Sequence, residues 1–350
     1  MNSGTSNRPI RVLVADDSSF ARELICAVLN SEPGVSVVGE AVNGLDAVAK
    51  VLELKPDLVT MDIEMPILGG LDAIERIMRE FPVPILVITA QSGVRAAFAA
   101  VSKGAMDVVE KPDISFESAR KLVKKVRMLS SVDIGAYLAA KNRGPGKARA
   151  PAVIPKTAGV NAGVIAIAAS TGGPQALHTI LSRLPADLPV PIIIAQHIAD
   201  GFTTGMVEWL NGGTSLSVCE LHHGDRLVSG TVYVNPAEFS VVCIRREGVL
   251  LKRREDGDRY HPSCNALLSG VATAYRDRAV GVILSGMGND GVDGMAAIRA
   301  GGGITIAQDA RSSVVYGMNR LAVEGGHIDS VMPLNHIPAA IMQLVGGKGR

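Results

Sequence analysis

The 350-residue sequence has few aromatic side chains, 3% of the total, and no long hydrophobic run. Its core must therefore be aliphatic, and no segment approaches the ~18 apolar residues that a membrane span needs, so we expect no membrane insertion. Its four cysteines lie far apart in the chain and form no CxxC pair, so neither a zinc site nor a disulfide framework is predicted. We interpret them as free thiols that pack in the core of a protein from a reducing compartment. A cytoplasmic location is therefore expected.

The chain also lacks an excess of either charge. Its 35 basic and 34 acidic residues leave a net charge of +1. This balance argues against a protein held on nucleic acid or on an anionic membrane by bulk electrostatics. No helix-turn-helix pattern is present either, so no nucleic-acid partner is expected.

What the sequence does have is an alternation of short apolar runs with helix-period segments, over a length that predicts two domains. Five such units between residues 8 and 129 predict a parallel, doubly wound α/β sheet of the flavodoxin-like size class. The expected strands are residues 10–15, 35–41, 57–62, 84–90 and 107–112.

The pattern stops over residues 130–161, which are rich in proline and glycine with a basic bias, and we interpret this stretch as an exposed linker. A second doubly wound α/β domain is predicted over residues 162–348. Its buried strands are expected at residues 164–169, 191–196, 279–286 and 304–308, with shorter alternating strands at 215–220 and 232–235. Two further strands around Glu247 and Gly248 predict an antiparallel hairpin.

Polar residues end the strands of the first domain, on the edge where open parallel sheets bind ligands. Asp16, Asp17 and Asp62 follow two of the strands, and Thr89 and Lys111 end two more. Three carboxylates on one edge repel one another unless a cation such as Mg²⁺ is present. A lysine and a hydroxyl beside them suit a phosphoryl group, for which a carboxylate can be the covalent acceptor. Singly, these residues could instead be helix caps, a turn hydroxyl and a surface charge.

Together, the motifs DD at 16–17, MDIEMP at 61–66, TA at 89–90 and KP at 111–112 resemble the receiver domain of bacterial two-component response regulators. The resemblance implies that Asp62 is phosphorylated, that Asp16, Asp17 and Asp62 bind Mg²⁺, and that Thr89 and Lys111 sense the phosphate. Two positions depart from that family. Val108 stands where an aromatic switch residue is common, and Gly69-Gly70 replaces an Asn-Gly or Asp-Gly turn.

The second domain has its own set of residues at strand ends. Ser170 follows one predicted strand, His197 ends the next, and Asp290 lies in the loop after a third. A serine nucleophile, a histidine base and an orienting aspartate are the groups that activate a hydroxyl for acyl transfer. The order Ser, His, Asp and the absence of GxSxG, with Ala168 two residues before the serine, exclude an ordinary α/β hydrolase. The three could also be a helix cap, a core histidine and a turn former.

A dinucleotide site is a competing interpretation of this domain. Gly286, Gly288 and Gly291 form GxGxxG between a strand and a helix, and Asp309 ends the next strand. Against it, Asp290 inside the loop would face a pyrophosphate, and too little chain follows to complete a nucleotide-binding half.

A second resemblance decides between these interpretations. The segments ASTGGP, QHI, YHPSCNAL, LSGMGNDG and AQDARSSVVYGM, between residues 169 and 318, are similar to the catalytic domain of the chemotaxis protein-glutamate methylesterases, the CheB family. This resemblance implies hydrolysis of glutamate γ-methyl esters on chemoreceptors and deamidation of receptor glutamines. By position, it makes Ser170 the nucleophile, His197 the base, Asp290 the orienter and the Met287 N–H an oxyanion donor, while Thr171 helps to place the imidazole.

The two resemblances together imply a phosphorylation-activated serine esterase whose receiver blocks the active site until it is phosphorylated. Chemoreceptors would be its substrate and a histidine kinase its phosphodonor. Mg²⁺ would serve the receiver only, the esterase needing no cofactor, and a monomer is expected. The alternative is a protein that is not an enzyme: a phospho-switch that binds a partner. Departures from the CheB pattern at Trp209, Cys264, Asn265 and Asn319 bear on substrate preference rather than on the chemistry.

Overall fold

The computed structural model describes residues 8–90, 93–113, 115–135, 137–138, 162–245, 248–255 and 257–346, with only the backbone given at 242, 243 and 245. The predicted linker therefore lies largely outside the described residues. The chain divides into two compact units, Met1–Gly135 and Ala136–Arg350. Each unit is described by itself.

The first unit is a five-stranded parallel sheet, as the sequence predicted, and its strand order is β2-β1-β3-β4-β5. Its strands are β1 (Ile10–Ala15), β2 (Val35–Ala41), β3 (Leu58–Met61), β4 (Ile85–Thr89) and β5 (Asp107–Glu110). The helices between and after them are α1 (Ser19–Asn30), α2 (Gly44–Leu54), α3 (Gly70–Glu80), α4 (Val94–Lys103) and α5 (Phe116–Leu129).

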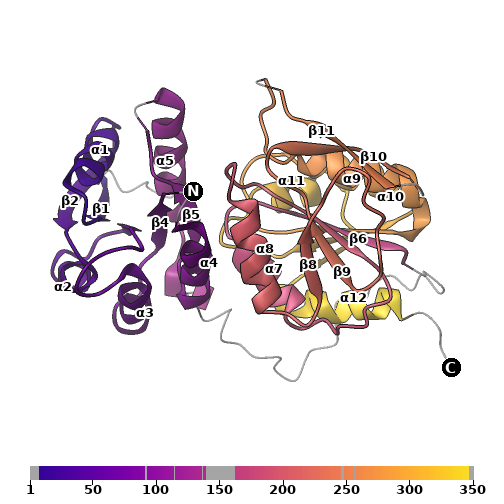
Figure 1. The fold of residues 1–350 in the computed structure, drawn as a ribbon, viewed down its shortest axis with the longest axis horizontal. Helices are drawn as coiled ribbons and strands as arrows, with labels where there is room; N and C mark the ends of the chain where they lie inside the picture. Colours follow the sequence, from indigo (N-terminus) through magenta and orange to yellow (C-terminus); the bar gives the residue numbers. More distant parts are fainter. Residues whose placement is uncertain are drawn as a thin grey trace, which may run out of the picture. The chain divides into compact units, whose positions relative to one another are not determined.

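Helices cover both faces of this sheet, as Figure 1 shows. One face packs its aliphatic side chains against α2, α3 and α4, and α1 lies against α5. Because both faces are covered, β3 and β4 are buried along their whole length, and their sequences are almost continuously apolar. The Ser18 side chain accepts a hydrogen bond from the Ala21 N–H and caps α1, which directs the chain away from the β1 edge.

The second unit contains a seven-stranded parallel sheet in the order β14-β13-β12-β6-β7-β9-β8. Its strands are β6 (Val164–Ala169), β7 (Ile192–Gln196), β8 (Ser217–Glu220), β9 (Thr231–Val234), β12 (Ala279–Ile283), β13 (Ile304–Gln308) and β14 (Ser330–Met332). From β6 the sheet continues through β7, β9 and β8 on one side and through β12, β13 and β14 on the other. Open parallel sheets bind ligands at the strand ends where the order reverses, which here is the carboxyl end of β6 and β12.

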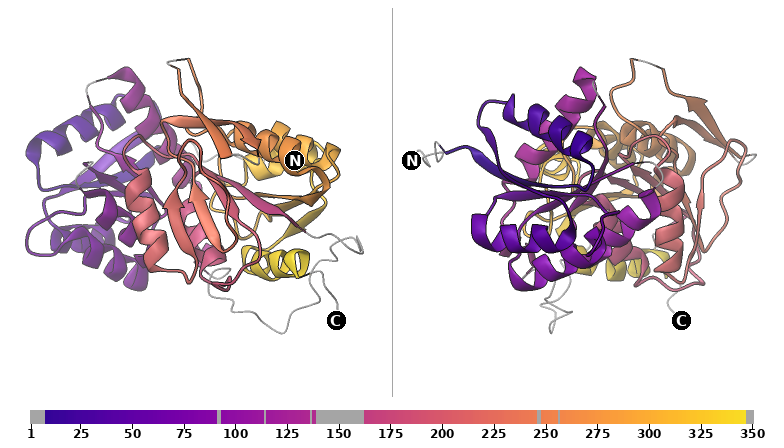
Figure 2. Two further views of the ribbon diagram at one scale, coloured as in Figure 1. Left: turned by 45° about the vertical axis from the view of Figure 1, so that its right-hand side comes forward. Right: turned by 60° about the vertical axis from the view of Figure 1, so that its left-hand side comes forward.

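Two layers of helices sandwich this sheet (Figure 1). The helices are α7 (Gly173–Leu181), α8 (Thr203–Gly212), α9 (Cys264–Tyr275), α10 (Val292–Ala300), α11 (Met318–Glu324) and α12 (Ile337–Val345). One face shares a buried aliphatic cluster with α9, α10 and α11. The antiparallel hairpin of β10 (Phe239–Arg245) and β11 (Gly248–Arg253) packs on α9 and stays outside the main sheet, as Figure 2 shows.

The two short strands predicted at residues 215–220 and 232–235 are confirmed as β8 and β9, which pair in parallel and form one edge of the sheet. The opposite edge strand β14 was not predicted, because its three residues form no apolar run. Among the described residues, no helix has the length and apolar character needed to cross a membrane.

Candidate active site

The carboxyl ends of β1, β3 and β5 bring together the acidic residues and the lysine expected in the first unit. Lys111 Nζ lies 2.8 Å from Asp62 Oδ2 and 2.8 Å from Asp16 Oδ2. Carboxylate oxygens of Asp16, Asp17 and Asp62 lie within 4.8 Å of one another, with Asp17 exposed. Thr89 is buried at the end of β4, where its hydroxyl donates to the Ala90 carbonyl at 3.3 Å.

Burial and charge act together on Asp62. Burial raises the pKa of its carboxyl, and the nearby Asp16 charge adds to the rise. The ion pair with Lys111 and the hydrogen bond from the Ile63 N–H oppose this rise without reversing it. A divalent cation among these oxygens would relieve the same repulsion, so the donor set fits Mg²⁺.

The residue that departs from the common turn is Gly69, the N-cap of α3, which makes no side-chain capping hydrogen bond. The glycine after it is shared with the common turn and is required by the packing: a Cβ added to Gly70 would lie 2.0 Å from the Asp62 carbonyl oxygen, so α3 can start close to the end of β3. Val108 packs against the aliphatic core between the sheet and α2 to α4. The position of the common aromatic switch is thus occupied by a partly buried valine.

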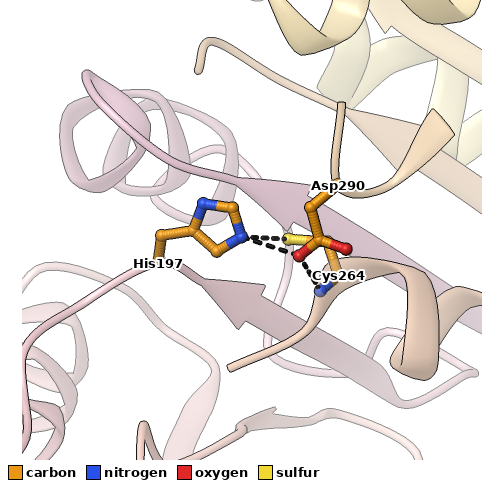
Figure 3. A group of neighbouring side chains, drawn as sticks. All are labelled: His197, Cys264 and Asp290. Atoms are coloured by element: carbon orange, nitrogen blue, oxygen red, sulfur yellow. Dashed lines mark hydrogen bonds and ion pairs between the residues drawn. The ribbon is translucent and has the colours of Figure 1, made fainter. Parts of the chain in front are cut away.

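The second unit places its candidate residues at the centre of its sheet. Ser170 follows β6, His197 follows β7, and Asp290 lies in the loop between β12 and α10. His197 Nε2 lies 2.8 Å from Asp290 Oδ2 (Figure 3). Asp290 is 2% exposed and the His197 side chain 15%, so the pair is shielded from water while the imidazole stays accessible.

Several donors hold the Asp290 carboxylate. Its Oδ2 accepts the Cys264 N–H at 2.6 Å, and its Oδ1 accepts the Asn265 N–H at 2.9 Å and the Ser263 hydroxyl at 3.3 Å. Burial by itself raises the pKa of Asp290, but the His197 ring and the two backbone donors outweigh it and lower that pKa. The carboxylate is therefore ionised at neutral pH and can accept a hydrogen bond from Nε2–H of the imidazole.

With Nε2 turned toward Asp290, the other ring nitrogen, Nδ1, is the one left to take a proton from Ser170. No hydrogen bond joins Ser170 Oγ to this ring among the described residues. Catalytic hydrogen bonds are often long without substrate, so this geometry remains compatible with proton transfer.

The loop after β12 lies directly against Ser170. The Ser170 N–H donates to the Ser285 carbonyl at 3.0 Å, and a Cβ added to Gly286 would lie 2.6 Å from the Ser170 Cβ. A glycine at 286 therefore lets the peptide leading to Met287 approach Ser170. Thr171 is buried, and its carbonyl accepts the Ser285 hydroxyl at 2.7 Å, which fixes the turn between β6 and α7.

Two residues missed by the sequence reasoning also border the His197 ring. Tyr260 stacks on the imidazole with ring centroids 5.2 Å apart and an angle of 10°, and its hydroxyl donates to Asn289 Oδ1. Cys264 Sγ lies 3.5 Å from His197 Nε2. Both precede or begin α9, far from His197 in sequence. The segment that contains them was part of the family resemblance, but no spacing pattern in the sequence placed them beside this histidine.

Other departures from the CheB pattern have roles in the fold. Asn265 Oδ1 accepts the N–H groups of Gly291 and Gly294, and Asn319 Nδ2 donates to the Gln308 carbonyl. Trp209 stacks on His178 with ring centroids 5.0 Å apart.

The loop geometry does not favour dinucleotide binding. The Asp290 carboxylate points to His197, and the Asp309 carboxylate accepts the N–H and the hydroxyl of Ser312 in its own turn. The acidic group expected to bind a ribose is thus engaged within the protein.

Comparison with known proteins agrees with the geometry. Residues 165–341 match the family model for CheB methylesterase, and residues 12–127 match that for the response regulator receiver domain. The chain is 44% identical over 347 residues to "Protein-glutamate methylesterase/protein-glutamine glutaminase 3" of Paramagnetospirillum magneticum, covering 96% of each. It is 42% identical to the similarly named protein 2 of Anaeromyxobacter dehalogenans, over 98% of this chain and 99% of that one.

A solved structure extends the comparison to the fold. The CheB methylesterase catalytic domain of Thermotoga maritima superposes with a TM-score of 0.51 at 33% identity, over 53% of this chain and 100% of that one. The chain therefore belongs to the CheB methylesterase family, with a response regulator receiver domain ahead of the methylesterase domain.

Proposed function

We propose that the protein is a phosphorylation-activated protein-glutamate methylesterase that also deamidates glutamine, with Ser170 as nucleophile, His197 as base and Asp290 as orienter. The observation that carries this assignment is the buried His197–Asp290 pair, at 2.8 Å, on the sheet edge where Ser170 follows β6. The names of the relatives support both activities.

The reaction begins when His197 Nδ1 takes the Ser170 hydroxyl proton as the serine oxygen attacks the ester carbonyl. Asp290 accepts a hydrogen bond from Nε2–H, remains ionised, and stabilises the imidazolium that forms. The tetrahedral oxyanion lies by the Met287 N–H, which the close approach of Gly286 brings beside Ser170.

Collapse of this intermediate breaks the bond to the methoxy group, which leaves as methanol with the proton from His197. Water then attacks the acyl-serine with His197 again as base, releasing a glutamate carboxylate and free Ser170. With a glutamine substrate, ammonia leaves instead of methanol. No cofactor is required for these steps.

In the receiver, we propose that Asp62 accepts the phosphoryl group and that Lys111 and Thr89 bind its oxygens. Asp16, Asp17 and Asp62 would hold Mg²⁺, which when bound offsets the charge of the carboxylates and the phosphoryl group. The proximity of these carboxylates supports the assignment.

The proposed boundaries are 8–129 for the receiver, 130–161 for the linker and 162–348 for the catalytic domain. Chemoreceptors are the proposed substrates and a histidine kinase the proposed phosphodonor. We also propose a monomer that works in the cytoplasm. The reduced state of the described cysteines 26, 219 and 264 is in keeping with that compartment.

The decisive experiment measures methanol released from methyl-labelled chemoreceptor by the full chain and by Ser170→Ala. Loss of the nucleophile should lower the rate about a million-fold, to background. Equal release by both proteins would contradict the assigned nucleophile. If the wild-type chain released none yet still bound a partner when phosphorylated, the non-catalytic phospho-switch would be the correct interpretation.

A further inference from the structure

Three side chains of metal-ligating type converge in the second unit, as Figure 3 shows: His197, Cys264 and Asp290. One ligand atom from each lies within 4.8 Å of the other two. His197 Nε2 is 3.5 Å from Cys264 Sγ and 2.8 Å from Asp290 Oδ2. The thiol has no role in the reaction described above.

These distances are close to those of a tetrahedral zinc site. Zn–N bonds of about 2.0–2.1 Å and Zn–S bonds of about 2.3 Å, at a tetrahedral angle, separate N from S by roughly 3.5 Å. The observed separation of Nε2 and Sγ is 3.5 Å. Nε2 and Oδ2 would have to move apart from 2.8 Å to roughly 3.3 Å, a small rotation of the partly exposed imidazole.

The donor types distinguish this cluster from the carboxylates of the receiver. Sulfur, imidazole nitrogen and one carboxylate oxygen favour Zn²⁺, whereas three carboxylates favour hard cations such as Mg²⁺. The sequence predicted no zinc site because its cysteines form no close pair. The fold brings a single cysteine at the start of α9 to a histidine after β7.

We propose that His197, Cys264 and Asp290 form a Zn²⁺ site and that Zn²⁺ bound there reversibly inhibits the esterase. The inhibitory consequence rests on the proposed role of His197 as base. Water would fill the fourth position, on the accessible side of the imidazole.

Inhibition follows from the position of the ring proton. In the active form Nε2–H donates to Asp290, which leaves Nδ1 free to accept the Ser170 proton. Zinc bonded to Nε2 requires that nitrogen to be deprotonated, so the proton of the neutral ring moves to Nδ1. Nδ1 can then no longer act as a base.

Binding must also displace the proton of the Cys264 thiol, which is released to solvent as the Zn–S bond forms. The thiol is fully buried and donates to the Ala195 carbonyl at 3.4 Å. Burial first, and the Asp290 charge second, raise its pKa well above the ordinary value. Without metal it therefore stays a neutral packing group, which explains how a thiol can lie beside the catalytic pair.

The test titrates ZnCl₂ into the full-length protein and follows methanol release, comparing each variant with its own zinc-free rate. Cys264→Val removes the sulfur but keeps the backbone N–H that binds Asp290. Loss of an outer-shell partner alone weakens metal binding about 10–100-fold, so loss of this ligand should raise the inhibitory Zn²⁺ concentration at least tenfold. Chelation with EDTA should restore the wild-type rate. Asp17→Asn, which alters the receiver carboxylates, should leave the inhibition unchanged.

A second readout does not depend on catalysis. Co²⁺ bound through a thiolate gives a near-ultraviolet charge-transfer band, which should appear in the wild type and in Ser170→Ala and be absent from Cys264→Val. A cobalt band without zinc inhibition would support the metal site but refute the proposal that metal bound to His197 inhibits the esterase. Absence of the band from the wild type, or equal zinc inhibition of the wild type and Cys264→Val, would overturn the proposal.

Discussion

Asp62 and Asp290 are both buried aspartates beyond the carboxyl end of a parallel strand, but their surroundings move their pKa values in opposite directions. Asp290 receives His197 and two backbone N–H groups, which lower its pKa. Asp62 has Lys111 as its cation but also Asp16 beside it, and burial keeps its pKa raised. The first arrangement stabilises a permanent carboxylate. The second leaves a carboxylate whose charge is better accommodated when a cation or a phosphoryl group is present.

The raised pKa of Asp62 predicts a pH-dependent gain in stability on replacing it with asparagine. Below the ordinary aspartate pKa of about 3.9, the carboxyl is protonated in both the folded and unfolded states, so its ionisation does not change the free energy of unfolding. As pH rises through the folded-state pKa, the folded protein must carry a charge that burial disfavours, so its stability falls. Asp62→Asn should therefore raise the receiver's melting temperature at neutral pH, with a gain that shrinks toward acid pH.

This gain is measured by calorimetry of the full chain without Mg²⁺, following the transition that Mg²⁺ shifts in the wild type. Asp72→Asn is the matched control, since Asp72 is an exposed residue in the first turn of α3 and should give no such gain. An Asp62→Asn protein that melts below the wild type at neutral pH would contradict the argument.

At the scale of elements, the N-termini of two helices fix Asp290, the proposed orienting aspartate. The first N–H groups of α9 donate to the Asp290 carboxylate, while Asn265 on α9 accepts the N–H groups of Gly291 and Gly294 at the start of α10. Helix ends leave such groups without partners inside the helix, so each helix satisfies the other. The Asp290 loop is held between them.

Asn265→Ala should destabilise the catalytic domain by about 1 kcal/mol, the typical cost of losing a helix cap. Because the same side chain orders the Asp290 loop, kcat should fall while KM changes little. Denaturant unfolding and steady-state kinetics measure the two effects. Asn265→Asp keeps an accepting oxygen and should retain most of both properties. Wild-type kcat in the alanine variant would show that the loop is ordered by other contacts.

The same scale explains how much could be predicted from the sequence. The central strands and the two sheets were predicted because strands buried on both faces are continuous apolar runs, as in β6 and β12. β14 could not be found, because only its pairing with β13 makes it a strand. Ser170, His197 and Asp290 were candidates because strand ends share one edge. Cys264 and Tyr260 come from a segment that returns to this edge after the hairpin, and periodicity does not predict that return.

At the scale of the whole molecule, the net charge is near zero, so the overall charge does not attract a partner. Function depends instead on two local sites, one in each unit. The receiver carries a cluster of charge that suits phosphorylation, and the catalytic domain carries a shielded acid–base pair. Regulation then requires that phosphorylation change the equilibrium between an inhibited and an active state. A shift from 1:99 to 99:1 would need about 5.5 kcal/mol of differential stabilisation, so a smaller coupling gives a graded rise in activity.

This coupling predicts that a small phosphodonor with Mg²⁺ increases methanol release by the wild-type chain, and that Asp62→Asn abolishes the increase but keeps the basal rate. A coupling of 1–3 kcal/mol corresponds to an increase of about 5–150-fold. Lys111→Ala should accept the phosphoryl group yet respond less, because Lys111 Nζ lies against Asp62 Oδ2, where it would contact the phosphoryl oxygens.

Ser170→Ala controls for non-enzymatic release. An increase that survived in Asp62→Asn would show that activation does not pass through this carboxylate. Equal rates with and without phosphodonor in a wild type proven to be phosphorylated would mean that the receiver does not control the esterase.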